Sequence, residues 1–295
     1  MCLNFTRLRC RLPLIFCLLA TPFFMHALLK EAKCEPSTGF SSLQNKLVTD
    51  GFAKNQIETI YQNPLVYMDV QTILLLFKHR EAKLDYSQFT TEKAIQKARK
   101  YMEEHRSALE EAQQKYGVDP KVITAILLVE TKLGTSIGKK PILNTLSTFS
   151  ALADPKIREA VWLELTAVGQ TDRKRFDEWS DKKSKWAYGE LKAYLKYTDR
   201  EKFDPSTLFG SYAGAMGIAQ FMPSSILAYA KDGNYDGRID LFDHDDAVSS
   251  IAGYLKHFGW HPEIDRENAF NVIFHYNRSN YYVETILKIR ELLKG

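Results

Sequence analysis

The chain has 295 residues, 45% of them hydrophobic, which suits one large globular domain or two small ones. Its formal net charge is +4, and residues 1–34 account for all of it, so the remaining chain is electrically balanced. This balance excludes a protein that binds nucleic acid through a broadly basic surface, and we expect no nucleic acid as a partner.

Residues 1–33 are typical of a signal peptide or an N-terminal membrane anchor. Three arginines precede an apolar run over 12–29 that two prolines interrupt. The run is long for a signal and short for a membrane span, and we favour a cleaved signal. All four cysteines lie in residues 1–34, so the body can fold in an oxidising compartment without mispairing. We therefore expect export to the periplasm, with inner- or outer-membrane association through the N-terminus if it is retained.

The body, residues 34–295, is predicted to be helical almost throughout after a polar linker over 35–42. In the first half, the pattern predicts helices over about 43–51, 54–61 and 91–115. Residues 70–77 are equally compatible with a helix or a strand. No internal repeat and no convincing series of alternating strands occurs.

The second half of the body is also predicted to be helical. A helix with proline at its first position is expected from Pro141, and others over 185–199, 246–258, 268–276 and 280–294. Residues 154–182 are highly charged; they are expected to form helices that serve as a lid or a partner surface. The body is therefore expected to be an α-rich globular unit.

The helix predicted from Pro120 carries a carboxylate in an unusual position. Asp119 is a good N-cap, and Gly134 suits the stop. Glu130 continues the apolar stripe of this helix and lies in its last turn. Burial and the negative end of the helix dipole both raise the pKa of a carboxyl, as a general acid near neutral pH requires. The alternative is a glutamate at the margin of the stripe that reaches solvent.

Residues 210–225 form a stretch rich in Gly, Ala and Ser. Small residues let a ligand or another backbone approach closely. Ser211 and Gln220 are polar groups suited to orienting a polar ligand. Tight helix packing through small residues is the alternative explanation.

The acidic segment after Lys231 begins like a calcium-binding EF-hand loop. Oxygen donors occupy positions 1, 3 and 5 as Asp232, Asn234 and Asp236; position 6 is glycine, and Arg238 can offer its backbone carbonyl. Position 12 is Asp243 where a glutamate is expected. A metal-free turn rich in Asp and Asn is the alternative, and a calcium sensor is disfavoured because only one such loop occurs.

Several separated motifs together resemble the membrane-bound lytic murein transglycosylase B family. They are Tyr-Gly-Val-x-Pro from Tyr116, Val-Glu-Thr-x-x-Gly from Val129, and Gly-Ala-Met-Gly-x-x-Gln-Phe-Met-Pro-Ser-Ser from Gly214. The resemblance covers roughly residues 40–295. It implies an all-α dominated fold: a lysozyme-like catalytic core with an additional helical subdomain and an EF-hand-like loop.

The resemblance also implies roles for individual residues. It makes Glu130 the catalytic residue, and it extends the acidic loop so that Asp246, which would also cap the next helix, supplies the last metal ligand. Tyr86 also matches the family pattern, although the spacing there does not align cleanly. For Tyr281 we favour core packing, and for Tyr282 core packing and sugar contact are equally compatible. The residues that the resemblance places against the sugar are Ser211, Gln220, Tyr254, Tyr276, Asn277 and Tyr282.

The chemistry implied by the resemblance needs one carboxyl. Glu130 would protonate the oxygen between N-acetylmuramic acid and N-acetylglucosamine, then remove the proton from the muramoyl C6 hydroxyl. The product would carry a 1,6-anhydro end, with the nucleophile supplied by the substrate. We expect a monomer that acts on peptidoglycan glycan strands, needs no cofactor for the chemistry and binds a structural Ca²⁺. A muramidase that admits water and a non-catalytic peptidoglycan-binding protein are the alternatives.

Overall fold

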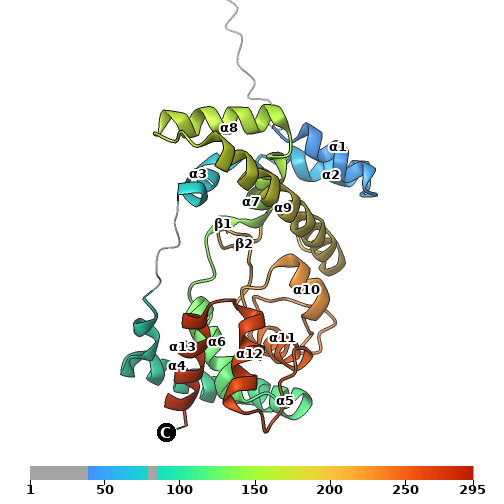
Figure 1. Cartoon of the computed structure of the whole chain (residues 1–295). Helices are drawn as coiled ribbons and strands as arrows, with labels where there is room; N and C mark the ends of the chain where they lie inside the picture. The colour runs from blue at the N-terminus through green and yellow to red at the C-terminus, as the bar shows by residue number, and fades with distance from the viewer. Residues whose placement is uncertain (1–38, 79–84, 295) are drawn as a thin grey trace, which may run out of the picture. The chain divides into compact units, whose positions relative to one another are not determined.

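The computed structural model describes residues 39–78 and 85–294 of the chain, and most of these residues are helical (Figure 1). The residues predicted as a signal peptide or anchor lie outside the described part. Within the described ranges, no helix is long and apolar enough to span a membrane. The elements of the first half are α1 (Ser41–Thr49), α2 (Lys54–Gln62), α3 (Val70–Lys78), η1 (Tyr86–Thr90), α4 (Glu92–Glu104), α5 (Arg106–Tyr116), α6 (Pro120–Thr131), β1 (Lys140–Pro141) and α7 (Ile142–Ala151).

The second half contains two long helices, a very short strand and a group of helices that ends the chain. Its elements are α8 (Pro155–Ala167), α9 (Arg173–Glu201), β2 (Phe209–Gly210), α10 (Pro223–Tyr229), α11 (His244–His257), α12 (Arg266–Tyr276) and α13 (Asn280–Leu292). The helical prediction for the body, including the charged segment 154–182, is therefore confirmed.

Side-chain caps explain where many of these helices begin. Thr91 accepts the backbone N–H of Ala94, and Asp172 accepts that of Arg175 at the start of α9. Each cap satisfies a backbone donor that has no partner within its own helix. The caps therefore fix where these helices begin.

Several boundaries differ from the sequence prediction. The helix expected over 185–199 begins at Arg173, and Pro141 is the N-cap of α7 and not its first residue. The single helix expected over 91–115 is two helices, because the backbone at His105 (φ −110°, ψ 29°) leaves the helical region. The helix expected to stop at Gly134 ends at Thr131, and Lys132 is the left-handed C-cap (φ 51°). The helix expected from Asp246 begins at His244, since Asp243 caps it.

Two hydrophobic clusters form the interior. The larger one takes in α1, α2, η1, α4–α7 and α9–α13. The smaller one lies among α3, α7, α8 and the first half of α9, where Phe77, Trp162 and Phe176 meet. Because α7 and α9 contribute buried residues to both clusters, these two helices connect them. This smaller cluster is the core of the additional helical part predicted from sequence.

A two-stranded antiparallel sheet pairs β1 with β2. Lys140 lies opposite Gly210, and Pro141 lies opposite Phe209. A Cβ added to Gly138 would lie 2.1 Å from the Gly210 carbonyl oxygen, so only glycine fits there. The sheet therefore holds the loop that follows α6 against the small-residue segment.

Candidate active site

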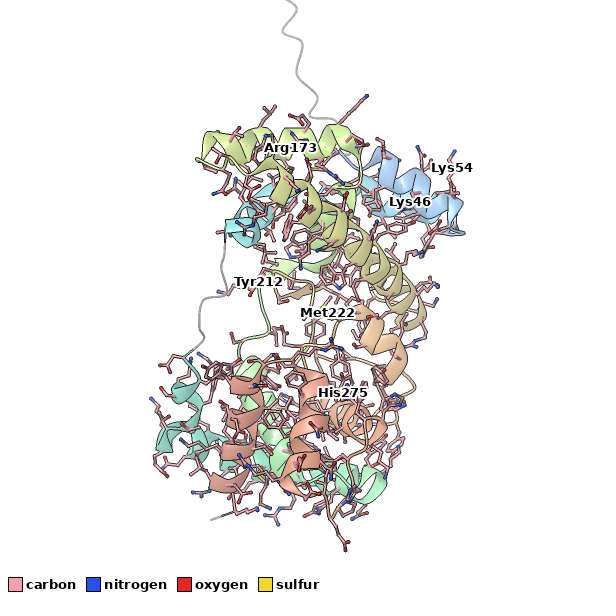
Figure 2. The ribbon with its side chains drawn as sticks, viewed as in Figure 1. Lys46, Lys54, Arg173, Tyr212, Met222 and His275 are labelled. Atoms are coloured by element: carbon pink, nitrogen blue, oxygen red, sulfur yellow. The ribbon has the colours of Figure 1, made fainter. Side chains whose placement is uncertain are left out.

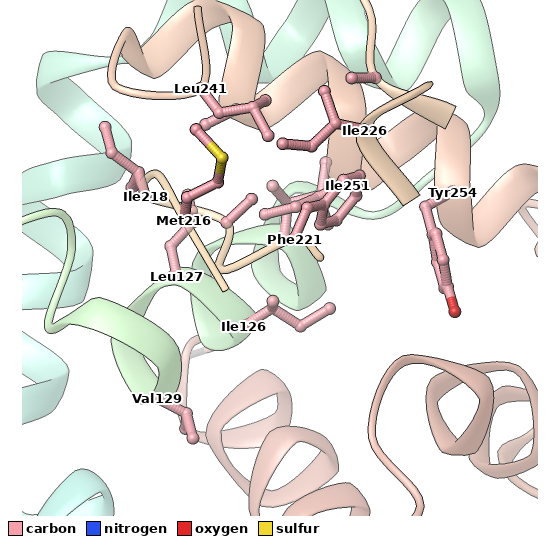
Figure 3. Close-up of a cluster of buried hydrophobic side chains, with 14 of the residues drawn as sticks. Ile126, Leu127, Val129, Met216, Ile218, Phe221, Ile226, Leu241, Ile251 and Tyr254 are labelled. Carbon is pink, nitrogen blue, oxygen red and sulfur yellow. The ribbon is translucent and has the colours of Figure 1, made fainter. Parts of the chain in front are cut away.

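Helix α6 presents Glu130 from a buried scaffold. Asp119 caps the helix by accepting the Lys121 N–H at 2.9 Å, and its other oxygen pairs with Arg290 of α13 at 2.8 Å. Nearly every other residue of α6 is buried, whereas Glu130 is half-buried. Figure 3 shows Ile126 and Leu127 of α6 beside Met216 and Phe221 of the small-residue segment, whereas Val129 lies away from that segment.

The Glu130 carboxyl has an environment that favours its protonated form. Burial raises its pKa from 4.5 to about 7, and the nearby Tyr282 hydroxyl opposes that rise by interacting with the carboxylate. Among the described residues, no second carboxyl contributes to this shift. A carboxyl with a pKa near 7 can donate a proton and then accept one at neutral pH.

Three tyrosines lie close enough to Glu130 to be affected by its charge. Burial raises the pKa of Tyr86, Tyr276 and Tyr282, and the Glu130 charge raises it further in each case. The Tyr282 hydroxyl is buried and has no hydrogen-bond partner of normal geometry. The structure thus brings Tyr86 to the same carboxyl, despite the imperfect sequence spacing there.

Tyr281 and Tyr282 have opposite environments, although they are adjacent. Tyr281 is 71% exposed, so the core packing that we favoured for it is wrong. Tyr282 is 1% exposed and stacks on Tyr276 with the ring centres 6.4 Å apart. Consecutive residues of α13 differ in this way because neighbouring helical positions point about 100° apart.

Ser211 shapes the turn in which it lies. Its hydroxyl oxygen accepts the backbone N–H groups of Ala213 at 3.2 Å and Ala215 at 3.0 Å. The backbone also closes the turn, since the Ser211 N–H donates to the Ala215 carbonyl. The hydroxyl hydrogen is not used in these bonds and can be donated to a ligand.

Gln220 holds two loops together. Its backbone is left-handed (φ 51°), and its amide nitrogen donates to the carbonyl oxygens of Gly217 at 2.8 Å and Ile137 at 3.2 Å. The amide oxygen remains an available acceptor. A non-glycine residue in this conformation is strained, and such strain often accompanies a functional site.

Two hydrogen bonds join the end of α6 and α12 to the small-residue segment. The Thr131 hydroxyl donates to the Ile218 carbonyl at 2.9 Å, and the Tyr276 hydroxyl donates to the Ala219 carbonyl. Thr131 was not singled out from sequence, although it directly follows Glu130 in the Val-Glu-Thr motif. These bonds place the residues just before Gln220 beside Tyr276 and the end of α6, where Glu130 lies.

Tyr254 contacts Tyr276, and Asn277 directly follows Tyr276 at the end of α12. The Tyr254 ring packs edge-on against Tyr276, and its hydroxyl donates to the His275 carbonyl at 2.7 Å. Asn277 ends α12 and is half-buried, and none of the described hydrogen bonds uses its side chain. Its amide is therefore available to an acetamido group, whereas the Tyr254 hydroxyl is already engaged within the protein.

The acidic loop folds as consecutive turns closed by side-chain to backbone hydrogen bonds. Asn234 accepts the N–H of Asp236, which in turn accepts the N–H of Arg238. One carboxylate oxygen of Asp232 accepts the Gly237 N–H at 2.9 Å, and the other is buried without a partner. A buried oxygen of this kind suits a hard cation.

Asp246 anchors the loop, and the sequence prediction that it also caps the next helix is wrong. It is 1% exposed, and its two oxygens accept the backbone N–H groups of Gly233 at 2.7 Å and Asp240 at 2.6 Å. The cap of α11 is Asp243, because its carboxylate accepts the first free N–H groups of that helix. Among the described residues, no three Asp, Glu, His or Cys side chains already converge as metal ligands do. A cation here would rely on the amide and backbone oxygens as well.

A family model described as "Transglycosylase SLT domain" matches residues 36–267. The chain is also similar to the membrane-bound lytic murein transglycosylase B of Escherichia coli K12, at 36% identity over 172 residues. That match takes in 58% of this chain and 40% of the relative, so the chain matches well under half the length of this curated relative.

Solved structures share the fold over most of the chain. The Escherichia coli lytic transglycosylase Slt35 in complex with calcium is 25% identical, with a TM-score of 0.68 over 88% of this chain and 93% of its own. The soluble lytic transglycosylase SltB1 of Pseudomonas aeruginosa is 23% identical, with a TM-score of 0.69 over 85% of this chain and 97% of its own. The predicted lysozyme-like, mainly helical fold class is therefore confirmed.

Proposed function

Since this chain belongs to the transglycosylase SLT domain family, we propose that it is a peptidoglycan lytic transglycosylase. It cleaves the β-1,4 bond between N-acetylmuramic acid and N-acetylglucosamine and leaves 1,6-anhydro ends. The observation that carries this proposal is the half-buried Glu130 carboxyl at the end of α6, with a pKa of about 7. The similarity to an Escherichia coli lytic murein transglycosylase supports it.

In the proposed reaction, Glu130 acts first as an acid and then as a base. The carboxyl gives its proton to the glycosidic oxygen as the bond to the muramoyl C1 breaks. The carboxylate then takes the proton of the C6 hydroxyl, whose oxygen bonds to C1. One carboxyl suffices because the substrate supplies the nucleophile, and no water is consumed.

The surrounding residues would orient the sugars. The Ser211 hydroxyl hydrogen, the Gln220 amide oxygen and the Asn277 amide are available for hydrogen bonds to a ligand. Tyr276 and Tyr282 lie near the Glu130 carboxyl, and the Tyr282 hydroxyl is buried without a hydrogen-bond partner among the described residues. Tyr254 supports Tyr276 through ring packing, so its contribution to substrate binding runs through that neighbour.

The acidic loop is proposed to hold a structural Ca²⁺. The side chains of Asp232, Asn234, Asp236 and Asp246, with the Arg238 carbonyl, supply the hard oxygen ligands that this ion prefers. The orphaned Asp232 oxygen supports the proposal, as does the calcium complex of the similar Slt35. The ion would hold the loop between the Gln220 segment and α11, away from the reacting atoms.

Export to the periplasm completes the proposal. The arginines and the apolar run of residues 1–33 are suited to directing secretion, either as a cleaved signal or as a membrane anchor. The cysteine-free body from residue 35 onward suits an oxidising compartment. Comparing the mass of the mature protein with that of the full chain in a membrane fraction separates the two possibilities.

Digestion of purified cell-wall sacculi, followed by mass analysis of the released fragments, tests the activity. We expect anhydro-muramoyl ends from the wild type and none from Glu130→Gln. Reducing ends alone would show a muramidase. Equal release by wild type and Glu130→Gln would overturn the catalytic role of Glu130. An absence of release, with binding to sacculi retained, would show a non-catalytic peptidoglycan-binding protein.

A further inference from the structure

Glu190 of α9 is a buried carboxylate that the proposed chemistry does not use. Its side chain is bonded to a single residue, Ser224. The Ser224 backbone N–H donates to one carboxylate oxygen at 2.9 Å, and the Ser224 hydroxyl donates to the other at 2.7 Å. A glutamate is rarely buried, because burial removes its charge from water. The two hydrogen bonds offset part of this cost and fix Ser224 against α9.

Helix α10 depends on Glu190 for its first turn. Its N-cap residue is Met222, labelled in Figure 2, and the Met222 side chain accepts no hydrogen bond from the helix. Pro223 follows and has no N–H, so Ser224 carries the first free backbone donor. Glu190 accepts this donor from the neighbouring helix α9 (Figure 1). Helix α10 is therefore capped by a residue of another helix.

The chain that leads into α10 is a narrow hairpin with Gln220 in its turn. Met216 and Phe221 form an antiparallel bridge, in which the Met216 N–H donates to the Phe221 carbonyl at 3.0 Å. Two residues between them have left-handed backbones, Gly217 (φ 74°) and Gln220 (φ 51°). A Cβ added to Gly217 would lie 2.5 Å from the Leu241 carbonyl oxygen, so the hairpin packs closely against the acidic loop. Such a turn has little room to adjust.

Hydrogen bonds hold this hairpin on both sides of Gln220. Before it, the Ile218 N–H donates to the Leu241 carbonyl at 2.7 Å. After it, the chain runs through only three residues, one of them Pro223, to Ser224 and its bonds with Glu190. Because proline fixes its own φ, a displacement of Ser224 is passed back along the chain toward Gln220.

We propose that Glu190 is a positioning residue for the reaction, which orients Gln220 toward the sugar by fixing Ser224. This inference rests on the proposed function, in which the Gln220 amide oxygen accepts a hydrogen bond from the substrate. The role requires a side chain of this length that ends in an acceptor oxygen, and it does not require a charge. Glu190 itself touches neither the substrate nor Glu130.

Two variants separate the length of the side chain from its charge. Glu190→Gln keeps the length, an acceptor for the Ser224 N–H and a polar partner for the Ser224 hydroxyl. Glu190→Asp keeps the charge but is one methylene shorter. We expect kcat for anhydro-end release from soluble glycan strands to stay within about twofold of the wild type in Glu190→Gln and to fall about tenfold in Glu190→Asp, since small misplacements of orienting groups lower rates steeply. The matched control is Glu178→Asp, because Glu178 is exposed on the same helix.

A double-mutant cycle shows whether the loss runs through Gln220. In a Gln220→Ala background, Glu190→Asp is expected to change kcat by less than about twofold, because the side chain that it positions is already absent. Losses that multiply would instead show a general structural role and overturn the proposal. Equal kcat values in Glu190→Gln and Glu190→Asp would overturn it too.

Melting temperatures establish that each variant is folded under the assay conditions. If Glu190→Asp does not fold, Ser224→Ala carries the same cycle, because it removes one of the two bonds and keeps the backbone bond. We then expect kcat to fall about threefold in the otherwise wild-type chain and to change little in the Gln220→Ala background. A fall of the same size in both backgrounds would overturn the proposal. Failure of the wild type to release anhydro ends would instead overturn the proposed function.

Discussion

At the scale of single residues, two opposite effects determine the pKa of the Glu130 carboxyl. Burial favours the neutral acid, while the Tyr282 hydroxyl favours the carboxylate. Because the Tyr282 hydroxyl has no other partner, we infer that its main effect is on the pKa of Glu130 and not on the packing of the core. The pair therefore determines the pH range in which one carboxyl can serve as both acid and base.

Tyr282→Phe tests this tuning. Removing the hydroxyl leaves the carboxylate without its stabilising donor, so the Glu130 pKa rises above about 7. The reaction begins with the protonated acid, so the basic limb of the pH profile of kcat/KM moves to higher pH. The measurement is anhydro-product release across pH, with exposed Tyr281→Phe as the matched control. A basic limb that stays in place or moves to lower pH would contradict the assignment.

Glu130→Gln is expected to stabilise the protein in a pH-dependent way. The folded pKa is about 7 against 4.5 in the unfolded chain, so the folded wild type binds more protons between these values. The stability of the wild type therefore falls as pH rises through this window. The glutamine amide of the variant does not titrate, so the free energy of unfolding of the variant does not fall with pH in this way.

The variant is therefore expected to gain on the order of 3 kcal/mol relative to the wild type between about pH 4 and pH 8. Denaturant unfolding of both proteins at the two pH values checks this expectation. A stability difference that stays the same at both pH values would contradict it.

The position of Glu130 could be predicted from sequence because it depends on local signals. The Asp119 cap, the apolar spacing of α6 and the Val-Glu-Thr motif all lie within fifteen residues of it. The place of Tyr86 near Glu130 was indicated only by an imperfectly aligned family pattern, because it depends on how distant parts of the chain pack together. The exposure of Tyr281 was missed for the same reason, since the face that α13 buries is decided by its contact with α6.

At the scale of elements, the acidic loop and the start of α11 form one unit. Asp243 caps the helix, and Asp246, one turn into it, accepts N–H groups from the loop. The sequence predicted the oxygen pattern of this loop because Asx turns are local. It assigned the cap to the wrong aspartate because Asp243, Asp245 and Asp246 are equally suitable by residue type, and only the folded backbone distinguishes them.

Calcium is expected to stabilise the wild type through this loop. At a concentration one hundred times the Kd, a bound ion adds about 2.7 kcal/mol to the stability of the folded state. Asp232→Ala removes the orphaned oxygen and is expected to abolish most of this gain. Melting temperatures with calcium and with a chelator provide the measurement, and Glu164→Gln on α8 is the control. An equal calcium response in Asp232→Ala would exclude the proposed site.

The break at His105 shows a second limit of sequence reasoning at this scale. Residues 91–115 are rich in good helix formers, so their pattern predicts one continuous helix. In the structure α4 and α5 each pack against α6, and the buried residues of each follow its own contact. Tertiary packing therefore overrides the local preference at the single residue His105.

At the scale of the whole molecule, the described part of the body should unfold as one cooperative unit despite its two hydrophobic clusters. The clusters share α7 and α9, so neither can lose its packing without disturbing helices that the other needs.

Phe176 is fully buried in the smaller cluster, and Phe176→Ala is expected to reduce the free energy of unfolding by about 3–5 kcal/mol. Three of the four tryptophans, Trp162, Trp179 and Trp186, lie at that cluster, and the fourth, Trp260, lies in the larger one. Tryptophan fluorescence therefore reports mainly on the smaller cluster, whereas far-UV circular dichroism reports on all helices. We expect both signals to change at the same denaturant concentration in the wild type, and to shift together to a lower one in the variant. Leu163→Ala, on the exposed face of α8, should leave both midpoints in place. A tryptophan transition that precedes the loss of helix would show instead that the smaller cluster unfolds independently, and that the Glu130 scaffold is stable without it.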